Sequence, residues 1–531
     1  MLVEGQLVAI EQRRIYPAQL RIENGIIVSI TEIEQAPNVF IIPGFVDAHV
    51  HIESSLLAPS EFARMALTHG TIATISDPHE IANVLGLAGV EYMIENGQQV
   101  PFYFNFGAPS CVPATVFETA GAAMPAAEVE QLLARPEILY LSEMMNFPGV
   151  LFDDPEVHAK IKAAHKYGKP VDGHAPGLRG KDLEKYVSAG ISTDHECYTL
   201  EEALDKIALG MKILIREGSA ARNFDTLIPL LKTHAKELMF CSDDKHPDSL
   251  LLGHINQLAA RAVALGNSVF DVLEVACLNP VKHYKMTHGT LQIGHSADFV
   301  IVKDVTHFEV LKTYIKGNLL AQEGVCLVES SPVKALNNFV ANEIDLGDLT
   351  YEPSDVEPIM VCLDGQLITE RINLPKAELT EENDVLKLVV VNRYTAAKPA
   401  IAYIKNFGIK GGAIAGSVAH DSHNIIAVGS SDEFICHAIN KVIKETGALV
   451  ACSKTETHVL PLALAGLMSV GEAWEVAKQY SLLDIFSKEV LGSNLRAPFM
   501  SLSFMALLVI PHLKLSDKGL FDGDTFSFVR N

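Results

Sequence analysis

The chain has 531 residues, so two or three domains are expected at about 150 residues per domain. Hydrophobic residues make up 48% and charged residues 20%, which is typical of a soluble globular protein. Its 65 acidic and 42 basic residues give a net charge of −23. This charge argues against nucleic acid and anionic membrane surfaces as partners, and favours a neutral or cationic small molecule.

The cysteines and the two ends of the chain indicate a cytoplasmic protein. The eight cysteines lack any C-x-x-C spacing, which predicts reduced thiols and excludes a zinc ribbon. Residues 1–5 lack the basic region and apolar core of a signal peptide. The apolar stretch 499–513 is interrupted by Ser501, Ser503 and Pro511 and is shorter than the roughly 20 residues that span a bilayer. We expect this stretch to lie in a buried core.

The most informative motif is the pair His49 and His51, which follows an apolar run, residues 40–46, that predicts one buried strand. Residues i and i+2 of a strand point to the same side, so both imidazoles can bind one cation at the strand's carboxyl end. Taken alone, the pair is equally well explained by chance, with one imidazole in the core and the other in solvent.

After His51 the chain alternates short β-rich runs with amphipathic runs of helical spacing. With the first strand, the seven that follow make eight parallel β/α units in about 230 residues, close to the ~250 typical of a TIM-like (β/α)₈ barrel. A doubly wound open sheet is the alternative. The predicted strands are 71–76, 102–106, 138–142, 170–173, 191–193, 212–215 and 238–241; the predicted helices include 155–167, 181–189, 200–209, 224–235 and 250–265.

The flanking segments predict two further domains. Short hairpin-like runs occur in residues 1–42 and again in 289–326, including 289–294, so residues 1–42 plus 285–340 are predicted to form one small β-sandwich around a barrel at 43–284. After the acidic stretch 342–348 a separate α/β domain is predicted at 345–531.

Metal-ligand and proton-transfer residue types follow the predicted strands at one end. Since barrel enzymes carry their chemistry at the carboxyl ends of the strands, a closed ring would bring these side chains to one point, which an open sheet could not do. His174 or His195 alone is better explained as a structural histidine, but the whole set favours a two-metal site. The set is His49 and His51 after the first strand, Asp77, His79 and Glu80 after the second, Glu143 after the fourth, His174 after the fifth, His195 after the sixth, and Asp243 and Asp244 after the eighth.

Six motifs in the first half of the chain, PGFVDAHVHIESS, SDPHEIANV, LSEMMNFPGV, VDGHAPGL, STDHECY and FCSDDKHP, together resemble the bacterial-type adenine deaminases of the amidohydrolase superfamily. The resemblance covers essentially the whole chain, including the block 411–424, GGAIAGSVAHDSHN. Many binuclear relatives bridge their metals with a carbamylated lysine on the fourth strand. Residues 140–145, YLSEMM, contain no lysine, so the resemblance implies that Glu143 is the bridge.

The resemblance implies a metal-dependent hydrolase barrel that converts adenine to hypoxanthine and ammonia in purine salvage, and a homodimer. Mn²⁺ and Fe²⁺ are the expected metals, because they accept carboxylate oxygens beside imidazole. A cyclic-amide hydrolase of the hydantoinase or dihydroorotase type and a non-catalytic scaffold are the alternatives. The implied ligands of the two divalent ions are His49, His51, Glu143, His174, His195 and Asp243.

Three residues after the second strand and one after the eighth are candidates for proton transfer. Asp243 is expected to move a proton from the attacking water to the leaving amine, with Asp244 as its rival. Glu80 is the candidate for protonating the purine ring, which would require a raised pKa, and His79 and Asp77 would orient it or the leaving group. Helix capping by Asp77 is the alternative, and both roles can coexist.

The block His420, Asp421, His423 and Asn424 follows a glycine-rich apolar stretch, as expected of a strand-to-loop turn. A lid or purine-contacting surface, a second metal site and a satisfied polar turn all remain open for it. For Arg216, after the seventh strand, a substrate contact and a local salt bridge are equally well supported. The other histidines, among them His246 and His254, are predicted to be structural or surface residues.

Overall fold

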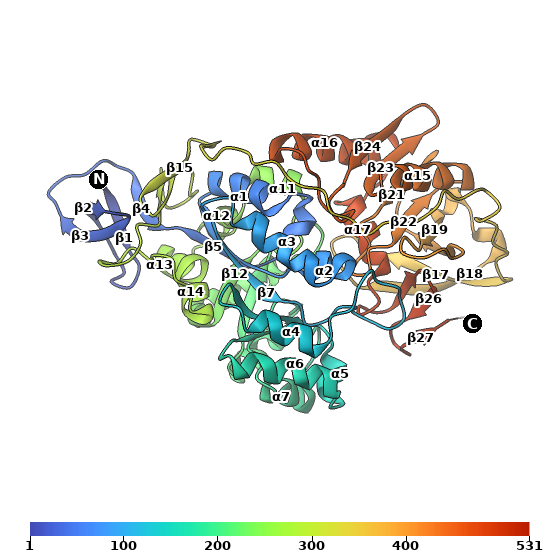
Figure 1. Cartoon of the computed structure of the whole chain (residues 1–531), viewed down its shortest axis with the longest axis horizontal. Coiled ribbons are helices and arrows are strands. Elements are labelled where there is room, and N and C mark those ends of the chain that lie inside the picture. The colour runs from blue at the N-terminus through green and yellow to red at the C-terminus, as the bar shows by residue number, and fades with distance from the viewer. Residues whose placement is uncertain (530–531) are drawn as a thin grey trace.

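The computed structural model describes residues 1–529. The chain forms three regions along its longest axis (Figure 1): a β-rich region beside the N-terminus, a central β/α region, and a C-terminal region on the other side. Within the described residues no helix is long and apolar enough to cross a membrane. All eight cysteines, which lie in this part of the chain, are free.

The central region is a closed barrel of eight parallel strands. Two sheets, ordered β5-β6-β7-β8-β9 and β10-β11-β12, are joined by parallel bridges between Val171 and Ile191 and between Val50 and Asp243. The open-sheet alternative is therefore wrong. The strands are β5 (Phe45–Val50), β6 (Thr71–Ser76), β7 (Tyr103–Ala108), β8 (Ile138–Met144), β9 (Val171–Gly173), β10 (Thr193–Asp194), β11 (Lys212–Arg216) and β12 (Leu238–Cys241).

The prediction of one strand at 40–46 is wrong, because the run divides between two sheets. β4 (Phe40–Pro43) pairs with strands of the N-terminal region, whereas β5 begins at Phe45 and pairs with β6. Gly44 lies between them. A Cβ at this position would lie 2.3 Å from Cδ1 of the buried Ile72, so only glycine fits where the chain passes from one sheet to the other.

Helices pack around the barrel, and two predicted helices are interrupted. Residues 224–235 form two single turns on either side of a 3₁₀ segment that contains Pro229, which cannot donate a helical hydrogen bond. Residues 250–265 break at Gly253, whose φ is +159°. The helices are α1 (Pro59–Thr68), α2 (His79–Leu85), α3 (Leu87–Gly97), α4 (Ala126–Leu133), α5 (Phe147–Leu151), α6 (Pro155–Lys166), α7 (Gly180–Ser188), α8 (Leu200–Ala208), α9 (Phe224–Leu227), α10 (Leu231–His234), α11 (Pro247–Leu252), α12 (Ile255–Ala264), α13 (Val269–Leu273) and α14 (Asn279–Tyr284).

The β-rich region combines strands from both sides of the barrel in one sheet, ordered β16-β15-β14-β13-β4-β1-β2-β3. Residues 289–294 form no strand, so that single prediction is wrong. The strands are β1 (Leu2–Ala9), β2 (Arg14–Glu23), β3 (Ile26–Glu32), β4, β13 (Phe299–Val302), β14 (Val310–Ile315), β15 (Asn318–Gln322) and β16 (Val325–Cys326).

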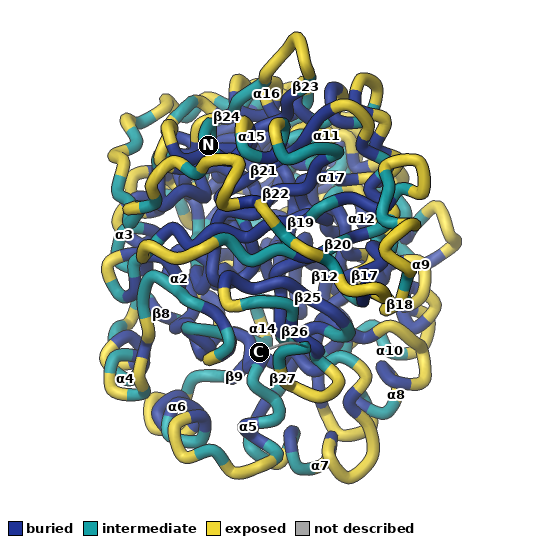
Figure 2. Tube along the Cα trace, turned by 90° about the vertical axis from the view of Figure 1, so that its right-hand side faces the viewer, coloured by how far each residue is buried: buried dark blue, intermediate teal, exposed yellow. Residues whose placement is uncertain are grey.

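The C-terminal region is built on a second eight-stranded sheet, ordered β18-β17-β20-β19-β22-β21-β23-β24. Helix α15 (Asp432–Lys444) packs an apolar face that includes Ile435, Ile439 and Val442 on this sheet. Exposed residues lie mostly along the periphery, while the sheet strands are largely buried (Figure 2). The strands are β17 (Val356–Cys362), β18 (Thr369–Pro375), β19 (Val385–Val391), β20 (Ala400–Lys405), β21 (Gly412–Gly416), β22 (Ile425–Gly429), β23 (Ala448–Ser453) and β24 (Thr457–Pro461).

The C-terminal region packs against the end of the barrel where the strands finish. Ser469 N–H donates to Leu56 O at 2.8 Å, and Ala473 N–H, at the start of α16 (Ala473–Ile485), donates to the buried Glu61 at 2.9 Å. Thr119 N–H, after β7, donates to Asp517 at 2.9 Å. The apolar stretch 499–513 includes most of α17 (Pro498–Ser503) and is mainly buried, which confirms its prediction as core. The small sheet of β25 (Leu513–Ser516), β26 (Gly519–Asp522) and β27 (Ser527–Phe528) follows it.

The close approach at Gly44 generates a stability prediction. Gly44→Ala should lower the free energy of unfolding by about 1–3 kcal/mol, because the added methyl group overpacks against Ile72. Denaturant titration of both proteins measures the difference. In an Ile72→Ala background the same substitution should cost less. An equal penalty in both backgrounds would show that Ile72 is not the obstacle.

Candidate metal centre

The side chains that follow the barrel strands converge in one buried cluster. His49 lies in β5 and His51 directly after it, and β8 carries Glu143. His174 and His195 directly follow β9 and β10, and Asp243 is the second residue after β12. All six side chains are at most 8% exposed. The parallel strands of a closed barrel point these positions to a single end, as the sequence analysis expected.

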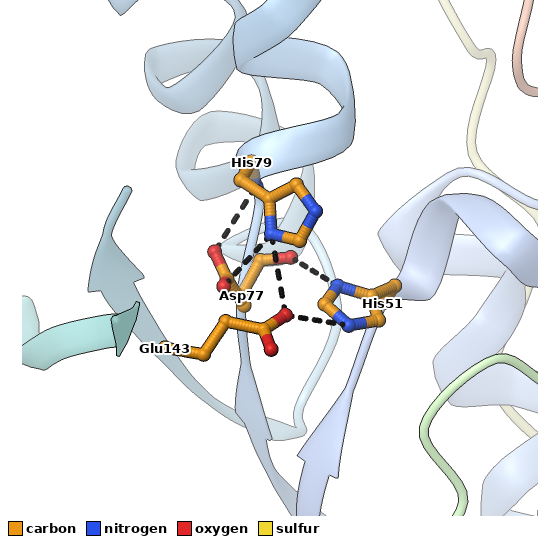
Figure 3. A group of neighbouring side chains, drawn as sticks. All are labelled: His51, Asp77, His79 and Glu143. Atoms are coloured by element: carbon orange, nitrogen blue, oxygen red, sulfur yellow. Dashed lines mark hydrogen bonds and ion pairs between the residues drawn. The ribbon is translucent and has the colours of Figure 1, made fainter. Parts of the chain in front are cut away.

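Glu143 lies at the centre of this cluster. Its Oε1 is 3.2 Å from His51 Nε2 and 3.6 Å from His79 Nδ1, and Figure 3 shows both imidazoles turned toward it. Its Oε2 is 2.6 Å from His174 Nδ1 and 3.2 Å from His195 Nε2. Burial alone would raise the pKa of the Glu143 carboxyl, but His174 and His195 outweigh it and hold that pKa well below its usual range.

A second set of donors overlaps with the first. His49 and His195 stack with ring centroids 4.1 Å apart, and Asp243 Oδ1 is 3.7 Å from His49 Nε2 and 3.3 Å from His51 Nε2. Ligand atoms of His49, His195 and Asp243 all lie within 4.8 Å of one another, as do those of Glu143, His174 and His195. Asp243 contacts both His49 and His51, and Asp244 joins Asp243 and His51 in a further group whose donor atoms lie within 4.8 Å of one another.

The donor set fits divalent cations. Among the residues that the structure describes, the buried Nε2 of His49 has no hydrogen-bond partner, and such an atom is costly unless something binds it. The Nδ1 of His51 is 3.3 Å from the carbonyl oxygen of Asp77, to which it can donate, which leaves its Nε2 free as a ligand. Imidazole nitrogens combined with carboxylate oxygens suit Mn²⁺, Fe²⁺ or Zn²⁺.

Arg216 holds one side of this cluster in place. Its guanidinium is 2.5 Å from Asp243 Oδ2 and binds both oxygens of Glu196. Of the two interpretations of Arg216, the structure shows the salt bridge. Glu196 was not predicted from the sequence. It directly follows His195, just as Asp244 directly follows Asp243, and this pairing of polar residues after a strand could have identified it.

The residues after β6 form a chain of contacts that leads away from Glu143. His79 Nδ1 is 2.9 Å from Asp77 Oδ2, and His79 Nε2 is 3.4 Å from Glu80 Oε1. The Asp77 carboxylate also accepts a hydrogen bond from the His79 N–H at the start of α2. Asp77 therefore orients the imidazole and accepts from the first N–H of α2, but the N-cap position is Pro78, and not Asp77 as the capping alternative had expected.

The block 420–424 comes from the loop between β21 and β22 and enters the barrel mouth. His420 Nε2 is 3.1 Å from Glu80 Oε1, and His423 Nε2 contacts Glu80 Oε2. Asp421 lies with His79 and Glu80 in a group whose donor atoms are within 4.8 Å of one another, and burial raises the pKa of Asp421 to about 6. Asn424, also buried, donates to Thr119 O.

The expectation of a raised pKa for Glu80 is wrong. Burial does oppose its ionisation, but His420, His423 and His79 surround the carboxylate and hold its pKa well below the usual range. The sequence could not show this, because two of these three imidazoles come from more than 300 residues farther along the chain.

His254 is a structural histidine, as predicted, and it supports the first strand. Its Nε2 is 2.8 Å from Asp47 Oδ2, and its Nδ1 is 2.8 Å from the Thr71 hydroxyl. Asp47 also accepts from the Ser242 N–H at 2.9 Å, so this buried carboxylate ties β5 to the segment after β12. Asp47 is two residues before His49 and lies on the same side of the strand, a position that the sequence analysis did not single out.

A cavity of about 450 Å³ opens beside the cluster, between the barrel loops and the C-terminal region. Its volume lies within the range of small-molecule sites. It is lined from the barrel by Met145, Asn146, Pro176, Gly177 and Tyr198, and from the C-terminal region by Ile368, Val509, Ile510, Pro511 and Phe526, among others.

Comparisons with known proteins agree with this architecture. Residues 40–320 match the model of the amidohydrolase family, and residues 366–527 match that of the adenine deaminase C-terminal domain. The chain is 53% identical over its whole length to an adenine deaminase of Sulfurovum sp., covering 99% of that protein. It is 50% identical to an adenine deaminase of Salinibacter ruber, with 99% of this chain and 98% of the relative covered.

Among solved structures, a β-aspartyl dipeptidase from Fervidobacterium islandicum is similar at 14% identity with a TM-score of 0.48, covering 62% of this chain and 100% of that one. By its fold and its barrel-end cluster the chain is an amidohydrolase, and it belongs to the adenine deaminase family within that class. Membership of the amidohydrolases implies a divalent metal at this centre.

The Arg216 ion pairs generate a prediction about the scaffold of the centre. Arg216→Gln leaves two buried carboxylates without their counter-charge, which should cost about 3–5 kcal/mol of unfolding free energy in chelator-treated protein. The matched control is Arg179→Gln, whose pair with Asp205 is exposed and should have no measurable effect. If denaturant titration gives equal values for the two variants, the Arg216 pairs do not support the centre.

Proposed function

We propose that this protein hydrolyses adenine to hypoxanthine and ammonia with two divalent ions. The observation that carries the proposal is the position of Glu143, a carboxylate with five histidines within 4 Å, on the strand where many amidohydrolases place a carbamylated lysine. Adenine deaminases about 50% identical over the whole chain support the substrate. The proposed ligands are His49, His51, Glu143, His174, His195 and Asp243, with Mn²⁺ or Fe²⁺ as the metals.

The competing functions lack such support. A hydantoinase or dihydroorotase would share the metal cluster, but β8 has the sequence ILYLSEM without lysine, and the relatives named above are adenine deaminases. A non-catalytic scaffold has no need of a complete and buried donor set. The predicted homodimer and cytoplasmic location remain predictions, and light scattering of the purified protein would measure the first.

The chain's own residues position the reactants. When bound, two divalent ions 3.5–4 Å apart, the usual range for two-metal sites, would lower the pKa of a water and supply the nucleophile. Asp243 takes the water's proton and delivers it to the leaving amine, as a general base and then a general acid. Arg216 holds the second oxygen of Asp243, so the first oxygen stays directed at the histidine cluster.

The opposite side of the cluster binds the purine. Glu80 delivers a proton to the ring, His79 orients it, and the buried carboxylate of Asp421 contacts a ring N–H or the amino group of the substrate. We assign the block 420–424 to a lid over the purine rather than to another metal site, because Glu80 is already contacted by two of its imidazoles. The proposed route of entry is the cavity lined by Met145, Asn146 and Pro176, which follow Glu143 and His174 in the chain.

Glu143→Gln tests the bridging role. The amide lacks the charge that holds two cations, so the variant should lose at least one bound metal and most of its turnover of adenine. Metal content by mass spectrometry and ammonia release are the measurements. The control is Glu137→Gln, which removes a partly exposed carboxylate just before the same strand. This variant should keep both its bound metal and its release of ammonia. A Glu143→Gln protein with two tightly bound ions and normal turnover would refute the assignment.

Glu80→Gln tests the ring-protonation role. Removal of a general acid should lower kcat by about 10²–10⁴-fold while the metal content is unchanged. Glu95→Gln, which removes an exposed carboxylate from nearby α3, is the control and should be fully active. Near-normal kcat in the Glu80 variant would transfer the role to His79.

A further inference from the structure

The proposed reaction, on which this inference rests, leaves one proton without a source. Hydrolysis of adenine consumes one water, whose two protons end on ring N1 and on ammonia. Glu80 is the group proposed to protonate the ring, yet its carboxylate is surrounded by imidazoles that keep it ionised. An ionised carboxylate accepts a proton and has none to give, so a neighbour must supply it.

His420 has the geometry of such a supplier. The hydroxyl of Ser503 donates to Met500 O at 2.8 Å, so its oxygen accepts from His420 Nδ1 at 3.0 Å. Nδ1 of His420 therefore carries a hydrogen, and any second proton is on Nε2. That nitrogen is 3.1 Å from Glu80 Oε1 and 3.6 Å from Asp244 Oδ1, so it faces two carboxylates at once.

The other two imidazoles at Glu80 are less suited to this role. His423 Nδ1 accepts from the Ala419 N–H at 3.3 Å, so its Nε2–H donates to Glu80 in the neutral form. Burial lowers the pKa of His423 to about 4, which keeps it neutral. His79 lies farther from Glu80, at 3.4 Å, and its other nitrogen is bound to Asp77.

We propose that His420, supplied by the C-terminal region, stores the proton that Glu80 transfers to the purine ring. The N–H bond at His420 Nε2 breaks as an O–H bond forms at Glu80 Oε1; that O–H bond then breaks as N1–H forms. The second proton of the consumed water, the one that Asp243 does not carry to the amine, reloads His420, so the two protons of the water end on N1 and on ammonia. His420 acts through Glu80 and does not itself touch the substrate.

The charge around His420 supports storage of a proton there. Burial opposes protonation, but Glu80 and Asp244 outweigh it and raise the pKa of His420 well above its ordinary value. The neighbouring Ser503 and Phe504 of the C-terminal region are uncharged. The titratable groups around the Glu80 and His420 pair are Asp244 and His246 after β12, His79 on α2, Glu53 after β5, and Asp421 and His423 on the same loop.

The test is the pH dependence of His420→Gln. The glutamine amide keeps an N–H donor near Glu80 but stores no proton. Relative to wild type at each pH, kcat/KM for adenine should fall by about 10²–10⁴-fold near pH 8. It should recover as the pH falls toward about 5, because Glu80 without its cationic neighbour then becomes protonated near the ordinary carboxyl pKa of about 4.3.

Two matched variants separate the possible outcomes. His423→Gln removes a neutral donor to the same carboxylate and should lower activity by one constant factor at every pH. Glu80→Gln should fail at every pH; if it keeps its activity, Glu80 does not protonate the ring and the role of His420, which acts through Glu80, falls with it, while the deamination of adenine itself stands. The inference is overturned if His420→Gln, with wild-type metal content, loses no activity or loses the same factor at all pH values.

Discussion

The structure depends on the burial of the Glu143 carboxylate among five imidazoles. A lone buried charge is prohibitively unfavourable, so the barrel end must surround this carboxylate with donors from several strands. The same requirement recurs at Asp243, whose pKa is held low, against the effect of its burial, by Arg216. A site with so many buried ionisable groups is ready to bind cations, because its carboxylates are already ionised and its imidazoles already oriented.

The C-terminal region is part of this electrostatic system. Its loop between β21 and β22 places His420 and His423 against Glu80, a residue of the barrel. The barrel therefore supplies the candidate metal cluster, and the C-terminal region supplies two of the imidazoles beside Glu80, the residue proposed to protonate the purine. This division explains why the block 420–424 is buried although it lies on a loop.

Much of the barrel could be predicted from the sequence, because short apolar runs followed by polar ligand types repeat in order. β6 and β12 begin and end where predicted, and His49, His51, Glu143, His174, His195 and Asp243 do come together. The sequence pattern misled where distant segments decide the structure: the apolar run before His49 divides because β4 pairs with β1 and β13 while β5 pairs with β6. Gly44 lies at the division, where only glycine fits beside Ile72 of a neighbouring strand. The ionisation of Glu80 was mispredicted for a similar reason, since its imidazole neighbours are brought to it only by the packing of distant segments.

The central claim is that Glu143 holds two divalent ions between the two overlapping sets of histidines. Anomalous diffraction from crystals of the manganese-loaded protein tests it most directly. The account predicts two manganese peaks about 3.5–4 Å apart, one on each side of the Glu143 carboxylate. A single peak remote from Glu143, or a peak between Glu80, His420 and His423, would contradict it.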